Sequence, residues 1–381
     1  MTAKNKNNIV ANVPNLRFPE FEGEWKECGF SDIGTFFKGT GISKEQLTEI
    51  GTPCILYGEL YTTYKNEVIK VVKSKTTINT NGLFFSKSND VIIPSSGETA
   101  IDISTACCVL LDNILLGGDL NIIRPEKHDG SFISYQLNGK RKYDIAKIAQ
   151  GSSIIHLYND SLKKLKVYAP KYISEEEKIA TLLSLLDDRI STQSKSIKEL
   201  ETLMKGLIHS FIREKEVNIQ LKDCLNCHSS TLMESAVQEK SGIYPVYGAT
   251  GIIVYTTDYE VYKDAILIIK DGAGVGKVQY AKDKYSVIGT LNYLIAKENV
   301  SLKYLYYYLM IFNFDKYKVG SGIPHIYFKD YGNEYIYCPP IEEQCKIANF
   351  LSAIDEKLET EKQILKKYIE QKKYLLVNMF V

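Results

Sequence analysis

Apolar residues recur at alternating steps of four and three positions along two long segments of the chain. Gln193 is the one polar interruption of the first segment, and Glu361 and Lys372 interrupt the second. Such spacing over about five heptads is typical of a coiled-coil seam, whereas a helix lying on a globular core carries a broader apolar stripe. The first seam consists of Ile179, Leu183, Leu186, Ile190, Ile197, Leu200, Met204, Leu207 and Phe211, and the second of Ile347, Leu351, Ile354, Leu358, Leu365, Tyr368, Leu375 and Met379.

Each seam predicts a helix of about 40 residues, roughly 60 Å long at 1.5 Å per residue. The two helices are expected to pair antiparallel within the chain and to form a rod with one globular region at each end.

The chain also repeats itself. Gly151–Leu157 (GSSIIHL) matches Gly320–Ile326 (GSGIPHI) 169 positions later, and Glu175–Ile190 matches Glu343–Leu358 at an offset of 168. Ordered identities across a single one-residue gap indicate an internal duplication. The regions between these matches differ, and Gly51–Tyr64 has no evident counterpart in the second half.

The regions outside the seams read as mixed α/β structure. Strand-like runs include Val68–Ser74, Asp90–Pro94, Ala265–Lys270 and Tyr285–Ala296, and Ser301–Phe312 reads as a helix opened by a serine cap. The predicted fold class is α+β, with two mixed α/β globular domains separated by two long helices that form an intramolecular antiparallel coiled coil. The predicted divisions are a disordered tail over 1–13, a globular domain over 14–172, a helix over 173–215, a second globular domain over 216–340 and a C-terminal helix over 341–381.

Composition narrows the class of protein. The 381 residues are 44% hydrophobic and 24% charged, as in ordinary globular proteins. No apolar run reaches the roughly 18 residues of a membrane helix, and the polar N-terminus lacks a signal-peptide core. The eight cysteines include one C-x-x-C-H run at Cys224–His228 without a second ligand pair, so no metal site is expected. Reduced thiols and a cytoplasmic location are the expectation.

Charge is balanced overall, with a net value of +1, but it is uneven along the chain. The segment Gln136–Tyr172 contains eight basic residues against two acidic ones, which could neutralise several DNA phosphates or could simply form a solvated surface. The five arginines all lie at or before Arg213. If the second domain reads DNA, it should depend on lysine for guanine and on Asn or Gln for adenine, or make few guanine contacts. The candidate DNA-contacting residues are Lys38, Lys140, Arg141, Lys142, Ser152, Lys277 and Ser321.

The glycine-rich run Ile268–Tyr280 (IIKDGAGVGKVQY) invites comparison with a phosphate loop. Three residues separate Gly272 from Gly276 where a phosphate loop has four, and Val278 follows the lysine where a hydroxyl is required. A strand-like run follows instead of a helix. The run therefore predicts a tight turn between two strands, with Lys277 as a candidate phosphate contact.

The repeated histidines, His156 and His325, form a separate pair of candidates. Because both halves contain this residue, its role is shared, and a shared role cannot read two different base sequences. A turn-fixing residue or a contact to another subunit is therefore favoured over a DNA-phosphate contact.

Taken together, these features resemble a known family. The run Pro14–Trp25 (PNLRFPEFEGEW), the two G-S-x-I-x-H segments and the two P…E-x-x-K-I-A…L-S…D helix starts are similar to the specificity subunit of Type I restriction–modification systems. The resemblance covers the chain from Pro14 to its C-terminus. It implies two target-recognition domains, each reading one half of a bipartite site in double-stranded DNA, and a coiled coil that sets their separation.

The resemblance also implies partners. Two modification subunits would dock on the chain and methylate adenine with S-adenosylmethionine, and two restriction subunits using ATP and Mg²⁺ could join them. The chain itself would bind no cofactor and have no catalytic activity. In agreement, Cys338–Ile341 (CPPI) lacks both the Asn or Asp and the aromatic residue of an adenine methyltransferase motif.

Two alternatives stand beside this interpretation. The chain could be a stand-alone DNA-modification or nucleotide-hydrolysing enzyme, which would require an intact methyltransferase motif or phosphate loop. It could instead be a coiled-coil adaptor that does not bind DNA, which would show no salt-dependent DNA binding.

Overall fold

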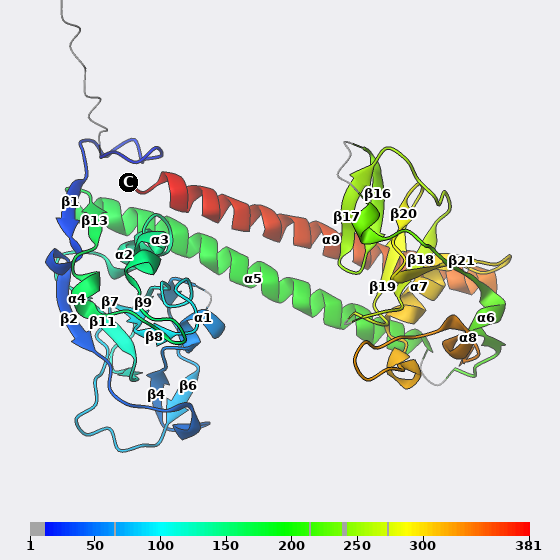
Figure 1. Ribbon diagram of the computed structural model, residues 1–381, viewed down its shortest axis with the longest axis horizontal. Coiled ribbons are helices and arrows are strands. Elements are labelled where there is room, and N and C mark those ends of the chain that lie inside the picture. Colours follow the sequence, from blue (N-terminus) through cyan, green and yellow to red (C-terminus); the bar gives the residue numbers. More distant parts are fainter. Residues whose placement is uncertain (1–11, 65, 213–214, 238–241, 273) are drawn as a thin grey trace, which may run out of the picture. The chain divides into compact units, whose positions relative to one another are not determined.

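The computed structural model describes residues 12–64, 66–212, 215–237, 242–272 and 274–381. The chain forms two compact units, and each contains one globular region and part of both long helices (Figure 1). Unit 1 comprises Met1–Ser194 with Ile364–Val381, and unit 2 comprises Lys195–Gln363. Among the described residues, no helix has the length and apolar character needed to cross a membrane.

The two predicted long helices are present as α5 (Ile173–Ile212, 40 residues) and α9 (Ile341–Asn378, 38 residues). Both begin with acidic residues in their first turn, which complements the positive end of the helix dipole. Proline precedes each helix closely, and the Pro340 carbonyl accepts hydrogen bonds from the first amides of α9.

The helices run antiparallel in both units. In unit 1, Lys372 of α9 pairs with Asp187 of α5 at 2.5 Å, and the Arg189 guanidinium lies 5.9 Å from the Tyr368 ring. In unit 2, a later α5 position pairs with an earlier α9 position, since Glu201 and Lys362 are 3.4 Å apart. Of the predicted seam residues, Ile179, Leu183, Ile197, Leu351 and Leu358 are buried, and Leu186, Ile190, Ile354 and Leu365 are half-buried.

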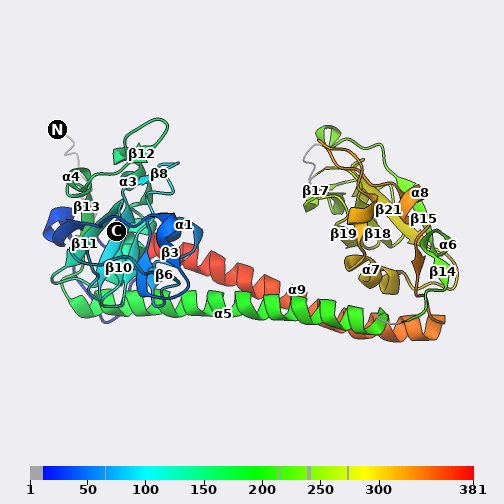
Figure 2. The same ribbon diagram turned by 90° about the horizontal axis from the view of Figure 1, so that it is seen from below.

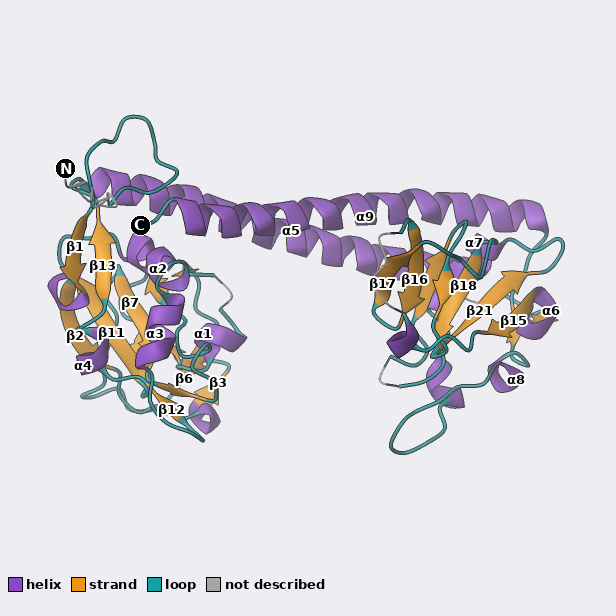
Figure 3. Cartoon of the chain, turned by 45° about the horizontal axis from the view of Figure 1, so that its top comes forward, coloured by secondary structure: helices purple, strands orange, loops and turns teal. Residues whose placement is uncertain are grey.

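The core of unit 1 is a five-stranded sheet of order β2-β11-β7-β9-β5. Its middle strand β7 (Asp90–Pro94) is buried along its whole length, as expected of a short continuous apolar run. Helices α2 (Gly130–Asn138) and α3 (Lys142–Ile148) follow β11 (Figure 3). The other strands of the sheet are β2 (Gly34–Lys38), β5 (Val68–Ile69), β9 (Cys107–Val109) and β11 (Leu120–Pro125).

A second sheet of unit 1 has the order β10-β4-β6-β3, and two strand pairs, β1-β13 and β8-β12, complete the unit. The predicted strand Val68–Ser74 is wrong in its extent, because strand structure stops at Ile69 and resumes at Ser74. The remaining elements of unit 1 are β1 (Lys26–Gly29), β3 (Leu47–Thr48), β4 (Thr52–Ile55), β6 (Ser74–Thr76), β8 (Ser96–Gly97), β10 (Leu115–Leu116), β12 (Ile155–His156), β13 (Lys166–Ala169), α1 (Glu59–Thr62), α4 (Asn159–Leu162) and the 3₁₀ turns Phe30–Asp32 and Lys44–Gln46.

Unit 2 is built on a four-stranded sheet, β15-β21-β18-β19, and a three-stranded sheet, β17-β16-β20. The predicted strand Tyr285–Ala296 divides into two at Gly289, whose amide bonds to the Leu232 carbonyl instead of continuing a ladder. The elements of unit 2 are β14 (Ile219–Gln220), β15 (Leu225–Ser229), β16 (Tyr244–Gly248), β17 (Gly251–Thr256), β18 (Ala265–Ile269), β19 (Val278–Ala281), β20 (Ser286–Val287), β21 (Leu291–Ala296), β22 (Tyr335–Ile336), α6 (Leu221–Cys224), α7 (Leu302–Met310), α8 (Phe328–Tyr331) and the 3₁₀ turns Glu234–Ala236 and Phe314–Tyr317.

Strand register shows that the two units share one frame. In unit 1, Ile93 of β7 lies opposite Asn121 of β11, and in unit 2, Ile268 of β18 lies opposite Asn292 of β21. The expectation that Gly51–Tyr64 lacks a counterpart is wrong. Strand β4 within that run pairs parallel with β10, as β16 pairs parallel with β20. The duplication therefore extends through both sheets, although few identities mark it in the sequence.

The N-terminal run joins the start of α5. Arg17 forms a bidentate ion pair with Glu175, in which its Nε and Nη2 atoms donate to the two carboxylate oxygens at 2.7 and 2.8 Å. The indole N–H of Trp25 also donates to Glu175, at 3.2 Å. The run Pro14–Trp25 thus satisfies a buried carboxylate at the beginning of the helix, where an unpaired charge would be costly.

Candidate nucleic-acid interface

The two G-S-x-I-x-H segments fold into the same hairpin. Gln150 and His156 exchange both backbone hydrogen bonds, at 2.9 and 2.6 Å, and Val319 and His325 do the same at 2.9 and 2.8 Å. Each pair closes a five-residue loop, residues 151–155 and 320–324. Figure 2 shows the first hairpin at β12, beside β8 and on the side of unit 1 away from α5.

Glycine opens each loop because the backbone there takes a left-handed conformation. The φ angle is +127° at Gly151 and +91° at Gly320. A Cβ atom would come within 2.1 Å of the Ile154 carbonyl oxygen in the first loop and 2.6 Å of the Ile323 carbonyl oxygen in the second. The repeated glycines are therefore explained by the geometry of the hairpin.

Both hairpins pack on the segment that leaves the buried central strand. In unit 1 the Leu157 amide donates to the Ser95 carbonyl at 2.9 Å, just after β7. In unit 2 the Ile326 amide donates to the Lys270 carbonyl at 3.0 Å, just after β18. The glycine-rich turn of unit 2 is therefore the structural counterpart of Ser95–Gly97. Its predicted strand–turn–strand form is confirmed by the antiparallel pairing of β18 and β19.

A buried asparagine lies near the start of both β11 and β21. The Asn121 side chain donates to the Leu157 carbonyl at 2.9 Å, which ties β11 to the end of the first hairpin. Asn292 accepts a hydrogen bond of 2.6 Å from Ser229. Sequence reasoning missed this pair, but the matched runs Gly118–Asn121 (GDLN) and Gly289–Asn292 (GTLN), 171 positions apart, carry the signal.

The histidines differ in side-chain surroundings although both close a hairpin. The Nδ1 atom of His325 lies 2.5 Å from a carboxylate oxygen of Asp271 in the glycine-rich turn. His156 instead lies opposite Ser96 in the β8–β12 pair and stacks on the Tyr158 ring at 6.1 Å. Their place at the closing pair accords with a turn-fixing role, and a subunit contact stays a prediction.

The candidate basic residues fall in different surroundings. Lys38 ends β2 opposite Asn121, which also bonds to the residue after the first hairpin, so the structure brings Lys38 and that hairpin together. Ser152 and Ser321 lie exposed within the loops. Lys277 is exposed at the far end of the glycine-rich turn.

Lys140, Arg141 and Lys142 lie elsewhere, between α2 and α3. Arg141 donates to the main-chain oxygen of Val381 at 2.9 Å, and its guanidinium lies 4.7 Å from the Tyr168 ring. The Arg141 side chain is only 18% exposed. Its contacts are those of a residue that holds the end of the chain against the globular region, while Lys140 is exposed and Lys142 half-buried.

Ion pairs reduce the positive charge that the segment Gln136–Tyr172 offers to a ligand. Arg141 and Lys147 both approach Asp144, at 3.3 and 3.7 Å. Lys163 pairs with Asp160 at 2.9 Å, and Lys166 pairs with Glu27 at 2.5 Å. Four of the eight basic side chains thus have an acidic partner, and one of these partners lies outside the segment.

Each globular region is tied to its helices by a tyrosine–aspartate contact that sequence reasoning missed. In unit 1, Tyr135 of α2 donates to Asp187 of α5 at 2.8 Å. In unit 2, Tyr307 of α7 donates to Asp355 of α9 at 3.4 Å and also contacts Ser352. Asp187 and Asp355 are matched residues of the helix repeat, so the same link is formed twice.

The electrostatics of the two links differ. Lys372 lies between Asp187 and Glu67 in unit 1, at 2.5 Å from each carboxylate. Burial acts to lower the pKa of Lys372, but the two carboxylates together hold it above its usual value. No described lysine forms an ion pair with Asp355. Burial, with a smaller contribution from Glu359, raises its pKa, and weaker effects of Tyr307, Lys362 and Lys303 oppose this rise.

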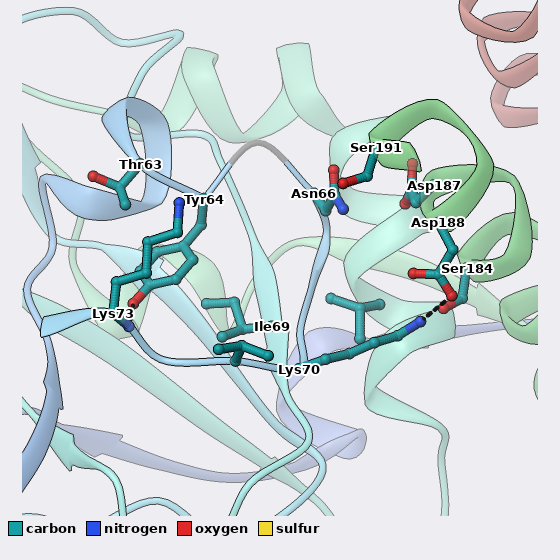
Figure 4. A pocket seen from close by; sticks show the side chains of 12 residues that line it. Thr63, Tyr64, Asn66, Ile69, Lys70, Lys73, Ser184, Asp187, Asp188 and Ser191 are labelled. Atoms are coloured by element: carbon teal, nitrogen blue, oxygen red, sulfur yellow. Dashed lines mark hydrogen bonds and ion pairs between the residues drawn. The ribbon is translucent and has the colours of Figure 1, made fainter. Parts of the chain in front are cut away.

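A groove of about 500 Å³ opens beside the unit 1 link (Figure 4). Ser184, Asp187 and Asp188 of α5 line one side, and Lys70 crosses to Asp188 at 2.6 Å. A smaller groove of about 330 Å³ in unit 2 contains Ser352 and Asp355 in the matching positions.

Two copies of one α/β frame, each with the same exposed hairpin and the same helix link, define a duplicated recognition scaffold. The family described as Type I restriction modification DNA specificity domain matches residues 22–202 and 214–371. The chain belongs to this family, whose specificity subunits are non-catalytic.

Individual relatives support the assignment. The chain is 26% identical to the putative type I restriction enzyme MjaX specificity subunit of Methanocaldococcus jannaschii, over 70% of this chain and 71% of that protein. It is 21% identical to the MjaVIII specificity subunit of the same organism, over 96% and 93%.

Solved structures share the fold. The S subunit of a Type I restriction–modification system from M. genitalium superposes with a TM-score of 0.71 at 18% identity, over 97% of this chain and 99% of that one. A chain from a study of complex assembly and conformational transition of the type I R-M system has a TM-score of 0.53 at 14% identity, over 94% and 97%.

Proposed function

We propose that this chain directs a type I restriction–modification complex to a bipartite site in double-stranded DNA. Each globular region would read one half of the site. The observation that carries this proposal is the duplication itself: two units share sheets, hairpin and helix link, yet differ in the elements around this frame.

The differing elements suit two different half-sites. Strand β4 pairs antiparallel with β6 as β16 pairs with β17, but in the described residues a further strand, β3, extends only the sheet of unit 1. Unit 2 also exposes Tyr255, Tyr259 and Tyr262, and Lys284 lies 4.8 Å from the Tyr259 ring. Because no arginine follows Arg213, guanine in the second half-site would be read by lysine, or that half-site would have few guanine contacts.

The paired helices would set the spacer between the half-sites. Helix α5 is continuous through both units, and its antiparallel partner α9 has nearly the same length. Removing one heptad from each helix shortens the pair by about 10 Å, or roughly three base pairs of DNA.

The partners would be two modification subunits that methylate adenine with S-adenosylmethionine. Restriction subunits that use ATP and Mg²⁺ would complete a cleaving complex in the cytoplasm. One structural relative comes from a study of complex assembly in the type I R-M system, which supports this partnership. The family membership of this chain points to the same class of partners.

Mapping of methylated adenines tests the proposal. Cells that produce this chain with its modification subunit should carry methyladenine at one bipartite sequence. The variant lacking one heptad in each helix should methylate the same two half-sequences at a shorter spacing. Altered half-sequences at the original spacing would overturn the spacer role, and methylation without any sequence preference would overturn the proposed function.

A further inference from the structure

The repeat around the two hairpins includes residues that the fold does not require. Ser152, Ile154 and Tyr158 of unit 1 match Ser321, Ile323 and Tyr327 of unit 2 at the offset of 169. All six are exposed, the isoleucines at 59% and 62% and the tyrosines at 50% and 47%. An exposed isoleucine at the tip of a loop stabilises the fold very little.

The other repeated residues of the hairpins do have a structural explanation. The glycines take left-handed backbone, the histidines close the loops, and Leu157 and Ile326 are buried. No such common reason covers the exposed residues. Tyr158 stacks on His156, whereas Tyr327 lies 5.3 Å from the Lys329 ammonium group. Their repetition therefore points to a ligand that both units bind in the same way.

Bases cannot be that common ligand, because the two units would read different half-sites. The sugar–phosphate backbone is the same in both. Serine and tyrosine hydroxyls donate hydrogen bonds to phosphate oxygens, and an aliphatic side chain can pack against deoxyribose. Two nearby carboxylates have partners within the chain, since Asp160 pairs with Lys163 at 2.9 Å and Asp271 with His325 at 2.5 Å.

We propose that the two hairpins bind the DNA backbone independently of base sequence, one hairpin at each half-site. In each, the isoleucine tip packs against the sugars while the serine and tyrosine hydroxyls donate to phosphates. This inference rests on the proposed function, and it assigns positioning, not base reading, to an element that both units share.

The test uses the full chain assembled with its modification subunits. Binding is measured on DNA containing the mapped site and on DNA with that site scrambled, and the mass of the complex is measured in parallel. Ile154→Ala and Ile323→Ala should each weaken binding to both DNAs by roughly fivefold. Tyr158→Phe and Tyr327→Phe should weaken it by roughly tenfold, because each loses a hydrogen bond to a charged group. The methylated sequence should not change.

Ile50→Ala in unit 1 and Ile243→Ala in unit 2 are matched controls. These isoleucines are 73% and 77% exposed and lie outside the repeat, so their replacement should leave binding unchanged. If the hairpin variants form a complex of lower mass, and the fraction that still assembles fully binds DNA normally, the hairpins contact a modification subunit and the proposal is wrong. A changed methylated sequence, or no effect, also overturns it. If the unsubstituted complex shows no preference for the mapped site, the proposed function itself fails.

Discussion

The two tyrosine–aspartate links show how one contact is maintained in two electrostatic environments. In unit 1, Asp187 is 5% exposed and shares Lys372 with Glu67. In unit 2 the matching Asp355 accepts a hydrogen bond from the Tyr307 hydroxyl, which also contacts Ser352. The helix repeat places the buried Met204 in unit 2 where Lys372 stands in unit 1. The first link therefore contains a directly paired cation, whereas the second relies on a hydroxyl donor, and Lys362 and Lys303 contribute only weakly to its electrostatics.

The largest effect is expected when unit 1 loses its lysine. Lys372→Met would leave the carboxylates of Glu67 and Asp187 buried together without a cation. Removal of one partner from a buried ionic group costs about 3–5 kcal/mol of the free energy of unfolding. Trp25 is the only tryptophan of the chain and lies buried in unit 1, so its fluorescence during urea unfolding reports this change.

A neutralised cluster provides the control for that experiment. The triple variant Glu67→Gln, Asp187→Asn, Lys372→Met removes all three charges together and should recover most of the lost stability, because no uncompensated charge remains. If the single Lys372→Met variant is as stable as the parent chain, the Lys372 charge is not needed to offset the two carboxylates.

A matched pair of amide substitutions should separate the two links further. Asp187→Asn removes one charged partner of Lys372 and should cost about 1.5–3 kcal/mol. Asp355→Asn keeps a hydrogen-bond acceptor for Tyr307 and removes a carboxylate that burial disfavours. It should therefore be neutral or slightly stabilising at pH 7.

The raised pKa of Asp355 predicts how the stability difference between Asp355→Asn and the parent chain changes with pH. Its pKa is raised in the folded state, so this group favours folding most at low pH, and that contribution is lost as the pH rises through the raised value. The advantage of Asp355→Asn over the parent should thus be present at neutral pH and vanish below about pH 3.9, the ordinary value for aspartate. Hydrogen exchange of α7, measured across this range, is the readout, and an advantage that grows on acidification would contradict the assignment.

Sequence periodicity predicted the long helices well because a heptad seam needs only local spacing to be recognised. It could not predict the links, since Tyr135 and Tyr307 lie far from their aspartates in sequence and in segments with few shared identities. The same limit hid the correspondence of Ser95–Gly97 with the glycine-rich turn, which only strand register reveals. Among the site residues, Ser152 and Ser321 were found through the repeat, whereas local charge alone selected Arg141, whose partners are distant in sequence.

The hairpins allow a smaller comparison between the units. Gly151→Ala and Gly320→Ala would force a side chain into left-handed backbone, at a cost of about 1–2 kcal/mol each. The effect should be larger at Gly151, where the added Cβ would lie closer to a carbonyl oxygen, at 2.1 Å against 2.6 Å. Local hydrogen exchange of each hairpin measures it. Gly322→Ala, with no atom within 4 Å of the added Cβ, is the control and should be neutral.

The smallest effects, and the finest distinction between the links, should come from removing single hydroxyl groups. Tyr135→Phe deprives Asp187 of a 2.8 Å hydrogen bond in a buried charged cluster, and should cost about 1.5 kcal/mol. Tyr307→Phe removes longer contacts of 3.2 and 3.4 Å to Ser352 and Asp355, and should cost about 0.5 kcal/mol.

The order of these two values matters more than their size. Burial is the main cause of the raised pKa of each tyrosine, so each hydroxyl is neutral and can donate at pH 7. The two acceptors differ. Asp187 lies beside the Lys372 ammonium group, whereas burial raises the pKa of Asp355 and so favours its protonated form. Acidification should therefore reduce the cost of Tyr307→Phe, because a protonated Asp355 is a weaker acceptor. Equal costs with the same pH dependence would show that the two links are electrostatically equivalent.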